Sequence, residues 1–322
     1  MEKLSGRIAV VTGGATGMGR ELVIALAAAG CDVASCDVNV DELAETQQRA
    51  LASAASGVRV STCRADVSNE ADFVAFRDHV RSEFDTAHIH LLFNNAGIAG
   101  AGSFIDDDRL AWEKTFNVDW GGVYLGCRTF LSMLIAAEEA HIVNTSSING
   151  IFASIGPQRP HTAYSAAKFA VRGFSEALIT DLRLNAPHVR VSVVMPGHVG
   201  TSIVINSGLA HGLDPDSLGE EDFVRIRQQI AGAGMAPDDM SDDDIRKLAQ
   251  VMGEAFRDFA PLTAKDAATI ILDGVRANQW RILVGEDAVF ADQEIRRTPE
   301  TAYDEEFWRN LQAHGYFGGF GN

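Results

Sequence analysis

Short apolar segments of strand length alternate with helical segments along most of the chain. Most lack the alternation of polar and apolar residues that marks a half-exposed strand, so burial on both faces of a parallel sheet is indicated. Because strand–helix–strand repetition requires right-handed crossovers, the sequence predicts an α/β fold with a doubly wound, seven-stranded parallel sheet. The predicted strands are Ile8–Thr12, Asp32–Cys36, Arg59–Cys63, His90–Asn94, His141–Thr145, Val189–Val194 and Arg281–Val284.

The pattern changes between residues 202 and 262. Here Glu220–Ile230 and Asp242–Phe259 have helical patterns separated by Gly, Pro and Asp residues, and no run typical of a strand occurs. We interpret 202–262 as a helical cap inserted into a single domain that spans 1–322. The last part, 288–322, is interpreted as a C-terminal tail that either contacts another subunit or is loose.

Composition and charge narrow the class of protein. The 322 residues are 46% hydrophobic and 22% charged, which excludes fibrous and largely disordered chains. A net charge of −17 disfavours nucleic acid and anionic membranes as partners. The sequence has no cleavable signal pattern and no apolar run of the ~18 residues that span a membrane, so a cytoplasmic protein is predicted.

The four cysteines, Cys31, Cys36, Cys63 and Cys127, include no C-x-x-C pair. They lie in apolar segments, which favours buried, reduced thiols over a metal or redox role. No cluster of His, Cys and Asp has the spacing of a metal site in the sequence, so no catalytic metal is predicted.

A glycine-rich turn, TGGATGMG at residues 12–19, joins the first predicted strand to a helix over Gly17–Ala29. Gly13 permits the tight turn, Gly17 lets the backbone approach a pyrophosphate, and Gly19 permits close packing of helix on strand. The helix N-terminus offers free N–H groups to an anion. Many turns contain glycine, but this position between strand and helix predicts dinucleotide binding.

Two carboxylates follow the next two predicted strands. Asp37 lies 20 residues after Gly17, where an acid accepts hydrogen bonds from the ribose hydroxyls of adenosine and repels a 2′-phosphate. It favours NAD over NADP as cofactor, and a solvated turn aspartate is the alternative. Asp66, followed by Val67, is placed to reach the adenine amino group, and its alternative role is an N-cap of the next helix.

Tyr164 and Lys168 are four residues apart in YSAAK, so they share one face of a predicted helix. A nearby cation stabilises phenolate and lowers the pKa of a tyrosine toward the working range of an acid/base catalyst. Ser146 and Ser147 follow the fifth strand, at the sheet edge where ligands of doubly wound folds bind, so a hydroxyl there is placed to polarise a carbonyl. The alternatives are an ordinary helix-surface pair and serines that cap a loop.

Together these motifs resemble the short-chain dehydrogenase/reductase family over about residues 5–201 and the strand near Arg281–Gly285. Each motif is common alone, but their shared order and spacing are specific. The resemblance implies a Rossmann-type fold and an NAD(P)-dependent oxidoreductase that acts on the CH–OH group of a small-molecule alcohol or its ketone. In order, the motifs are the glycine turn, Asp66-Val67, Asn94-Asn95-Ala96-Gly97, Asn117 in FNVDWGG, Ser147 in NTSSING, YSAAK, and Pro196-Gly197 with Thr201.

The resemblance also implies roles for individual residues. Tyr164 is the general acid/base, and Lys168 lowers its pKa and binds the nicotinamide ribose. Ser147 orients the substrate oxygen, while Asn117 holds a water that links Lys168 to solvent. A homodimer or homotetramer is implied, because the helix of Tyr164 usually packs in a subunit interface. The implied cofactor contacts are Gly13, Thr16, Gly17, Met18, Gly19, Asp37, Asp66, Val67, Asn95, Ala96, Gly97, Tyr164, Lys168, Pro196, Gly197, Val199 and Thr201.

Two departures from the family pattern bear on the substrate. The stretch between Ser147 and Tyr164 is longer than usual, which leaves Ser146 as an alternative; we choose Ser147 because Gly150 follows at the family's offset. The 202–262 cap is also longer, and its apolar side chains favour a bulky, mostly apolar secondary alcohol or ketone. The alternative is that these side chains only pack the cap onto the body.

Other interpretations of the site stay open. His161 and His198 lie near it, and hydrogen-bonded loop histidines are favoured over catalytic ones. An NADPH-dependent ketone reductase is one rival function, which Asp37 disfavours. A non-catalytic, dinucleotide-binding regulatory protein is the other, against which the complete set of predicted catalytic residues argues.

Overall fold

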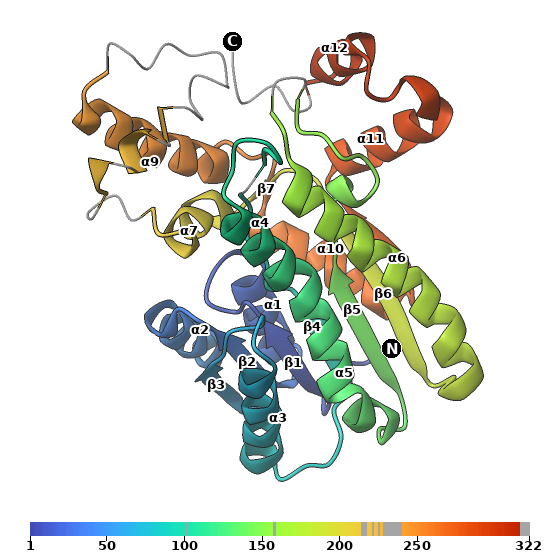
Figure 1. Cartoon of the computed structure of the whole chain (residues 1–322). Coiled ribbons are helices and arrows are strands. Elements are labelled where there is room, and N and C mark those ends of the chain that lie inside the picture. Colours follow the sequence, from blue (N-terminus) through green and yellow to red (C-terminus); the bar gives the residue numbers. More distant parts are fainter. Residues whose placement is uncertain are drawn as a thin grey trace.

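The computed structural model describes residues 1–100, 102–156, 159–213, 218–220, 222–224, 226–227 and 240–315. Its central strands are β1 (Ile8–Thr12), β2 (Asp32–Asp37), β3 (Val60–Arg64), β4 (Leu91–Asn94), β5 (Ala140–Thr145), β6 (Val189–Pro196) and β9 (Arg281–Val284). They form one parallel sheet in the order β3-β2-β1-β4-β5-β6-β9, which confirms the predicted α/β, Rossmann-type architecture (Figure 1). The chain order reverses between β1 and β4, which places a ligand-binding crevice beyond the carboxyl ends of these strands.

The strand register explains why the predicted strands lack polar alternation. Val10 of β1 lies between Ala34 of β2 and Leu92 of β4, and all three side chains are fully buried. Their neighbours along the same strands, including Val11 and Val33, are buried in a second cluster on the opposite face. Helices therefore cover both faces of the sheet, as expected for parallel strands.

Two layers of helices provide this cover. On one face α1 (Gly17–Ala28) packs against α2 (Val40–Ser53) and α10 (Ala264–Arg276). The N-cap of α10 is Thr263, whose side chain accepts a hydrogen bond from Asp266 N. On the other face lie α3, α4, α5 and α6, and a short π-helical turn joins α4 to α5. Their bounds are Glu70–Phe84, Arg109–Phe116, Gly122–Ile135 and Thr162–Asn185, with the π-helical turn at Asn117–Gly121.

The cap lies beyond the carboxyl ends of the strands (Figure 1). It contains α7 (Ile203–Ala210) and α9 (Asp242–Asp258), and a capping box between Ser241 and Asp244 begins α9. The predicted helix Glu220–Ile230 falls in part outside the described residues, and those of its residues that are described are helical.

One expectation for the cap needs correction. We expected no strand between residues 202 and 262, but β8 (Leu262–Thr263) begins there and pairs with β7 (Val199–Gly200). This pairing covers two residues of each strand, so it leaves no apolar run that a sequence pattern can detect.

The C-terminal segment differs from a loose tail. Its α12 (Glu305–Ala313) packs through Phe307 and Trp308 onto Phe152 of the loop after β5. Its α11 (Glu286–Arg297) joins the same apolar cluster through Ala291 and Ile295. Burial of these aromatic rings holds α12 on the body. Residues 316–322 of the predicted tail lie outside the described residues.

The described residues hold the four cysteines as free thiols, with Cys31, Cys36 and Cys127 buried and Cys63 half-buried. Burial raises the pKa of the Cys63 thiol to about 11, as expected for an unreactive cysteine. Among the described residues, no group of His, Cys, Asp or Glu side chains is arranged to hold a metal ion. No helix in this part of the chain is both long and apolar enough to cross a membrane.

Candidate active site

The glycine turn between β1 and α1 has the backbone geometry that its sequence predicts. Gly13 and Gly17 have φ angles of 70° and 56°, which L side chains rarely adopt. A Cβ on Gly19 would lie 1.9 Å from the Gly13 carbonyl oxygen, so only glycine fits there. The side chain of Thr16 makes no capping bond to α1, and its hydroxyl accepts from Asn206 Nδ2 at 2.9 Å. The first amides of α1 are therefore left without a side-chain cap.

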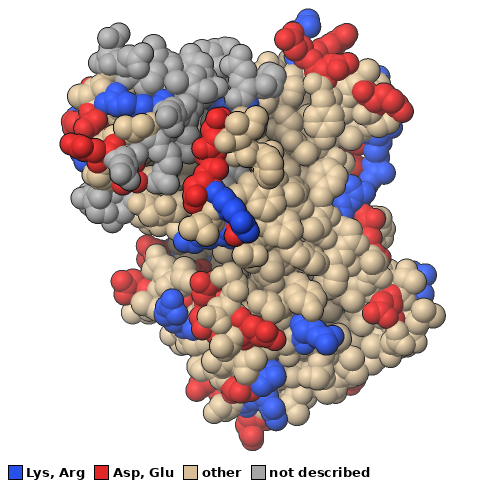
Figure 2. Space-filling model, in the orientation of Figure 1, with Lys and Arg blue, Asp and Glu red and all other residues tan. Residues whose placement is uncertain are grey.

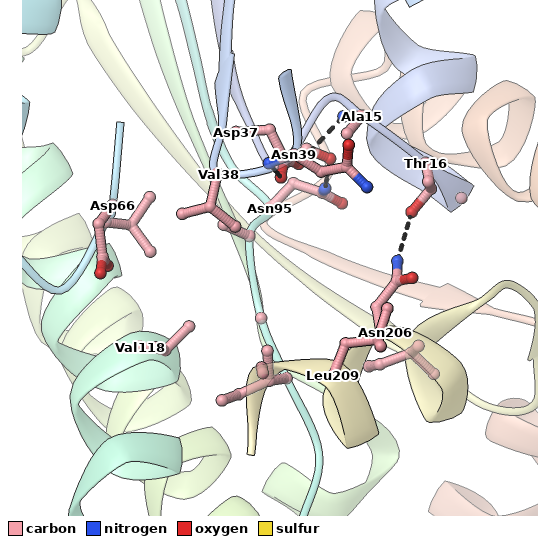
Figure 3. A pocket seen from close by; sticks show the side chains of 18 of the residues that line it. Ala15, Thr16, Asp37, Val38, Asn39, Asp66, Asn95, Val118, Asn206 and Leu209 are labelled. Carbon is pink, nitrogen blue, oxygen red and sulfur yellow. Dashed lines mark hydrogen bonds between the residues drawn. The ribbon is translucent and has the colours of Figure 1, made fainter. Parts of the chain in front are cut away.

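A cleft of about 480 Å³ opens at this turn, between the carboxyl ends of the strands and α7 (Figure 3). Eleven of the predicted cofactor contacts line it: Gly13, Thr16, Gly17, Met18, Asp37, Asp66, Val67, Asn95, Ala96, Gly97 and Thr201. Sequence reasoning missed Ile203, Asn206 and Leu209 of α7, which face the cleft from the cap. No sequence signal joins them to the glycine turn, because Asn206 and Thr16 are 190 residues apart.

The remaining predicted contacts lie outside the lining of this cleft. Gly19 packs beneath the turn, and Gly197 donates its N–H to Val284 O at 2.9 Å. Pro196 ends β6 and Val199 begins β7. Tyr164 and Lys168 also lie outside this lining.

Asp37 lies at the end of β2 with its carboxylate held by backbone amides. Its two oxygens accept from Ala15 N and from Asn39 N, each at 3.0 Å (Figure 3). Burial raises the pKa of this carboxyl from its usual value, and the backbone hydrogen bonds oppose that effect. Asp37 thus lies in the wall of the cleft and also closes a short turn through Asn39 N, so its role toward a ribose stays a prediction.

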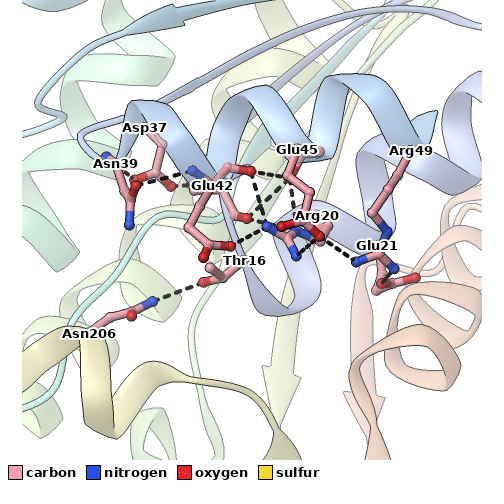
Figure 4. Close-up of polar contacts among 11 residues, drawn as sticks. Thr16, Arg20, Glu21, Asp37, Asn39, Glu42, Glu45, Arg49 and Asn206 are labelled. Atoms are coloured by element: carbon pink, nitrogen blue, oxygen red, sulfur yellow. Dashed lines mark hydrogen bonds and ion pairs between the residues drawn. The ribbon is translucent and has the colours of Figure 1, made fainter. Parts of the chain in front are cut away.

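Two arginines near Asp37 are already engaged with other groups. Arg20 donates to Ala15 O and forms ion pairs with Glu42 and Glu45 (Figure 4). Arg64, opposite Asp37 in the sheet, lies 3.5 Å from an Asp72 oxygen.

Asp66 lines the far side of the cleft, after β3. Its carboxylate accepts from Ser68 N at 2.9 Å and closes a short turn. The N-cap of α3 is Asn69, which accepts from Ala71 N, so the alternative that Asp66 caps this helix is wrong.

Tyr164, Lys168 and Ser147 come together at the carboxyl edge of β5. The Lys168 Nζ lies 5.2 Å from the centroid of the Tyr164 ring and donates to Thr145 O at 3.2 Å. The Ser147 hydroxyl lies close enough to the Tyr164 phenol to lower its pKa. Ser146 points elsewhere and donates to Lys168 O at 2.7 Å, so the serine beside the phenol is Ser147.

The pKa of Tyr164 reflects opposing influences. Burial raises it above its usual value and is the largest cause, and the carboxylate of Asp119 raises it further. The Lys168 cation and the Ser147 hydroxyl lower it. The charge of Lys168 therefore favours loss of the phenol proton, and the charge of Asp119 favours its retention.

The structure corrects the prediction for Asn117. This side chain is exposed, while Asp119 is fully buried with an oxygen 3.6 Å from Lys168 Nζ. Residues two apart in a helix point to roughly opposite sides, so Asn117 and Asp119 cannot both face Lys168. The π-helical turn that begins at Asn117 also shifts the helical phase, which hides this choice from the sequence pattern.

The two histidines near the site have different surroundings. The His161 ring lies against Tyr164 with centroids 4.7 Å apart, and burial lowers the pKa of this imidazole to about 4. The His198 ring contacts Phe256 O at 2.8 Å, and its backbone N–H donates to Asp287. His198 thus matches the predicted hydrogen-bonded loop histidine.

Comparison with known proteins gives a consistent picture. A family model described as short chain dehydrogenase matches residues 7–210. SadH of Mycobacterium tuberculosis, named as an oxidoreductase, is 37% identical over 68% of this chain and 76% of its own length. A 3-alpha-(or 20-beta)-hydroxysteroid dehydrogenase of the same organism is 35% identical over 62% of this chain and 71% of its own. A short-chain dehydrogenase/reductase from Burkholderia phymatum, crystallised with NAD, superposes with a TM-score of 0.73 at 26% identity, covering 94% of this chain and 98% of that one.

Proposed function

The chain belongs to the short-chain dehydrogenase/reductase family of oxidoreductases, and from this premise we propose that it interconverts a secondary alcohol and a ketone with NAD(H). Tyr164 is the proposed general acid/base. The observation that carries the proposal is the placement of Lys168 over the Tyr164 ring, with Ser147 near enough to lower the pKa of the phenol, at the sheet edge that also bears the glycine-turn cleft.

The cleft fits a dinucleotide. The positive φ angles of Gly13 and Gly17 bring backbone close to its floor, and the uncapped N-terminus of α1 suits a pyrophosphate. Asn95 Oδ1, in the lining, is buried with no hydrogen-bond partner among the described residues, as expected for an atom awaiting a ligand.

The chemistry divides between cofactor and protein. When bound, NAD⁺ supplies the acceptor for the hydride of the carbinol carbon, and NADH supplies the donor for the reverse reaction. Tyr164 Oη takes the hydroxyl proton during oxidation and returns it during reduction. Ser147 donates to the substrate oxygen, and Lys168 stabilises the phenolate from behind the ring.

We propose NAD rather than NADP as the cofactor. The Asp37 carboxylate at the end of β2 suits ribose hydroxyls and repels a 2′-phosphate. Arg20 and Arg64 are each paired with carboxylates, so neither is available to a phosphate without breaking an existing contact.

The proposed substrate is a bulky, mostly apolar secondary alcohol. Ile203 and Leu209 of α7 present apolar side chains to the cleft, and one similar relative is a hydroxysteroid dehydrogenase. We propose that 202–262 covers this substrate, within a single domain that includes α11 and α12 of 288–322.

The variant Leu209→Asp tests the role of the cap. Leu209 is 47% exposed in the cleft wall, and loss of a leucine contact of about 1.5–3 kcal/mol raises KM for a steroid-sized alcohol by at least about tenfold. KM for 2-propanol should change less than about twofold, since so small an alcohol does not reach this side chain. Leu51→Asp, at a leucine on α2 that is 48% exposed, is the matched control. Equal changes in KM for both alcohols would refute the cap assignment.

We also propose a homodimer or homotetramer formed through α5 and α6. Tyr124 and Ile135 are each 44% exposed on one face of α5, and Phe169 of α6 is 39% exposed. Figure 2 shows uncharged residues over much of this side of the molecule, with Lys and Arg interspersed among Asp and Glu elsewhere on the visible face. Exposed apolar surface of this kind is typical of subunit contacts.

Light scattering tests the assembly. The wild-type chain should have the mass of two or four chains, and the double variant Tyr124→Glu with Ile135→Glu should have that of one. Val74→Glu, at an exposed valine of α3, should leave the mass unchanged. A monomeric wild-type protein would contradict the proposal.

A further inference from the structure

Asp119 is a buried carboxylate that the proposed proton transfer does not use directly. Its side chain is 0% exposed, and its Oδ1 accepts from Ile98 N at 2.8 Å. Its Oδ2 lies 3.6 Å from Lys168 Nζ and has no hydrogen-bond partner among the described residues. Gly97 closes over both groups, since a Cβ there would lie 3.0 Å from Asp119 Oδ1 and 3.2 Å from Lys168 Nζ. A single carboxylate thus lies against the cation that faces the phenol.

The surroundings of Asp119 contain few other charges. The segment Gly97–Ile98 contributes a glycine and a backbone amide, and β5 contributes the carbonyl of Thr145 to Lys168. From α6 the titratable groups are Lys168 and Tyr164, and His161, just before that helix, is neutral at pH 7 because burial lowers its pKa to about 4. The electrostatics at the phenol is therefore dominated by one cation and one carboxylate.

We propose that Asp119 is a positioning residue that holds Lys168 and partly cancels its charge at Tyr164, so that the phenol keeps its proton to higher pH. The proposal rests on the proposed role of Tyr164 as acid/base. A carboxylate at this distance in a buried site opposes the effect of the cation on the phenol, because both act through the same low-dielectric surroundings.

Asp119 can offset the charge of Lys168 only at pH values where its own carboxyl group is ionised. Burial raises the pKa of Asp119 to about 6, while Lys168 and the Ile98 hydrogen bond oppose this effect. Above about pH 6 the carboxylate is charged and offsets Lys168. Below it Asp119 is neutral, and Lys168 acts on Tyr164 alone.

Direct titration of the phenol tests the inference without turnover. The chain has four tyrosines, so ¹³Cζ-tyrosine NMR can follow each one, and Tyr164→Phe assigns the signal of Tyr164. In Asp119→Asn, which keeps an acceptor for Ile98 N but has no charge, the pKa of Tyr164 should fall by about one pH unit. Asp292→Asn, which removes a buried carboxylate far along the chain on α11, should leave it unchanged. If Asp119→Asn does not fold, Asp119→Ser also removes the charge and has a smaller side chain. An unchanged pKa of Tyr164 in the folded neutral variant overturns the proposal.

The pH profile of alcohol oxidation gives a second measurement. The acid limb of kcat should move down by about one pH unit in Asp119→Asn, so turnover well below the midpoint rises about tenfold over wild type. A carboxylate with a purely structural role would lower kcat equally at all pH values and leave the midpoint in place. If neither protein oxidises any alcohol, the proposed function fails, while the NMR titration still decides the role of Asp119.

Discussion

Tyr164→Phe is expected to lower kcat for oxidation of a secondary alcohol by about 10²–10⁴-fold, the usual contribution of a positioned acid/base. The substitution removes one oxygen atom and keeps the ring against His161 and Lys168. Affinity for NADH should change less than about twofold, because the proposed dinucleotide contacts at the glycine turn and Asp37 are unchanged. Steady-state kinetics and a fluorescence titration with NADH measure the two quantities.

Tyr124→Phe provides the matched control for this variant. Tyr124 is an exposed tyrosine on α5, and its hydroxyl has no proposed part in the reaction. Turnover of Tyr124→Phe should equal that of wild type. Retained turnover in Tyr164→Phe would show that another group moves the proton.

A second large effect is expected from a change of cofactor preference. In Asp37→Ser with Val38→Arg, the ratio of kcat/KM for NAD⁺ to that for NADP⁺ should fall by about 100-fold or more. The change removes the carboxylate that repels a 2′-phosphate. It also adds a guanidinium at Val38, which lines the cleft and is 56% exposed. Paired kinetics with the two cofactors measure the ratio.

Asp41→Ser is the control for this second prediction. It removes an acid four residues farther along the chain, at the start of α2 and outside the lining of the cleft. The cofactor ratio of this variant should stay at the wild-type value. An unchanged ratio in the Asp37 double variant would mean that other groups select the cofactor.

The sequence was sufficient to predict the sheet and the backbone geometry of the glycine turn that we propose binds a dinucleotide. Buried strands leave continuous apolar runs, and Gly13 and Gly17 are required by their backbone angles. Asp37 was predicted because it stands at the end of a strand, where local geometry sets its position relative to the crevice. The choice of Ser147 over Ser146 needed the family pattern, in which Gly150 follows at a fixed offset.

Other parts of the site depend on contacts that no local pattern encodes. Asp119 was missed because the π-helical turn changes which side chain faces α6, and Asn117 in the same motif is the more familiar residue type. The hydrogen bond from Asn206 to Thr16 joins the cap to the glycine turn across the whole fold. Such contacts are decided by tertiary packing rather than by propensity.

The central claim, NAD-linked oxidation of an alcohol at Tyr164, is tested most directly by following NADH absorbance with a panel of aliphatic, aromatic and steroidal secondary alcohols. Wild-type protein with NAD⁺ should form NADH with at least one apolar alcohol, while Tyr164→Phe, shown to bind NADH, should stay at background. The account is contradicted if wild type forms no NADH across the panel, or if Tyr164→Phe forms it at the wild-type rate.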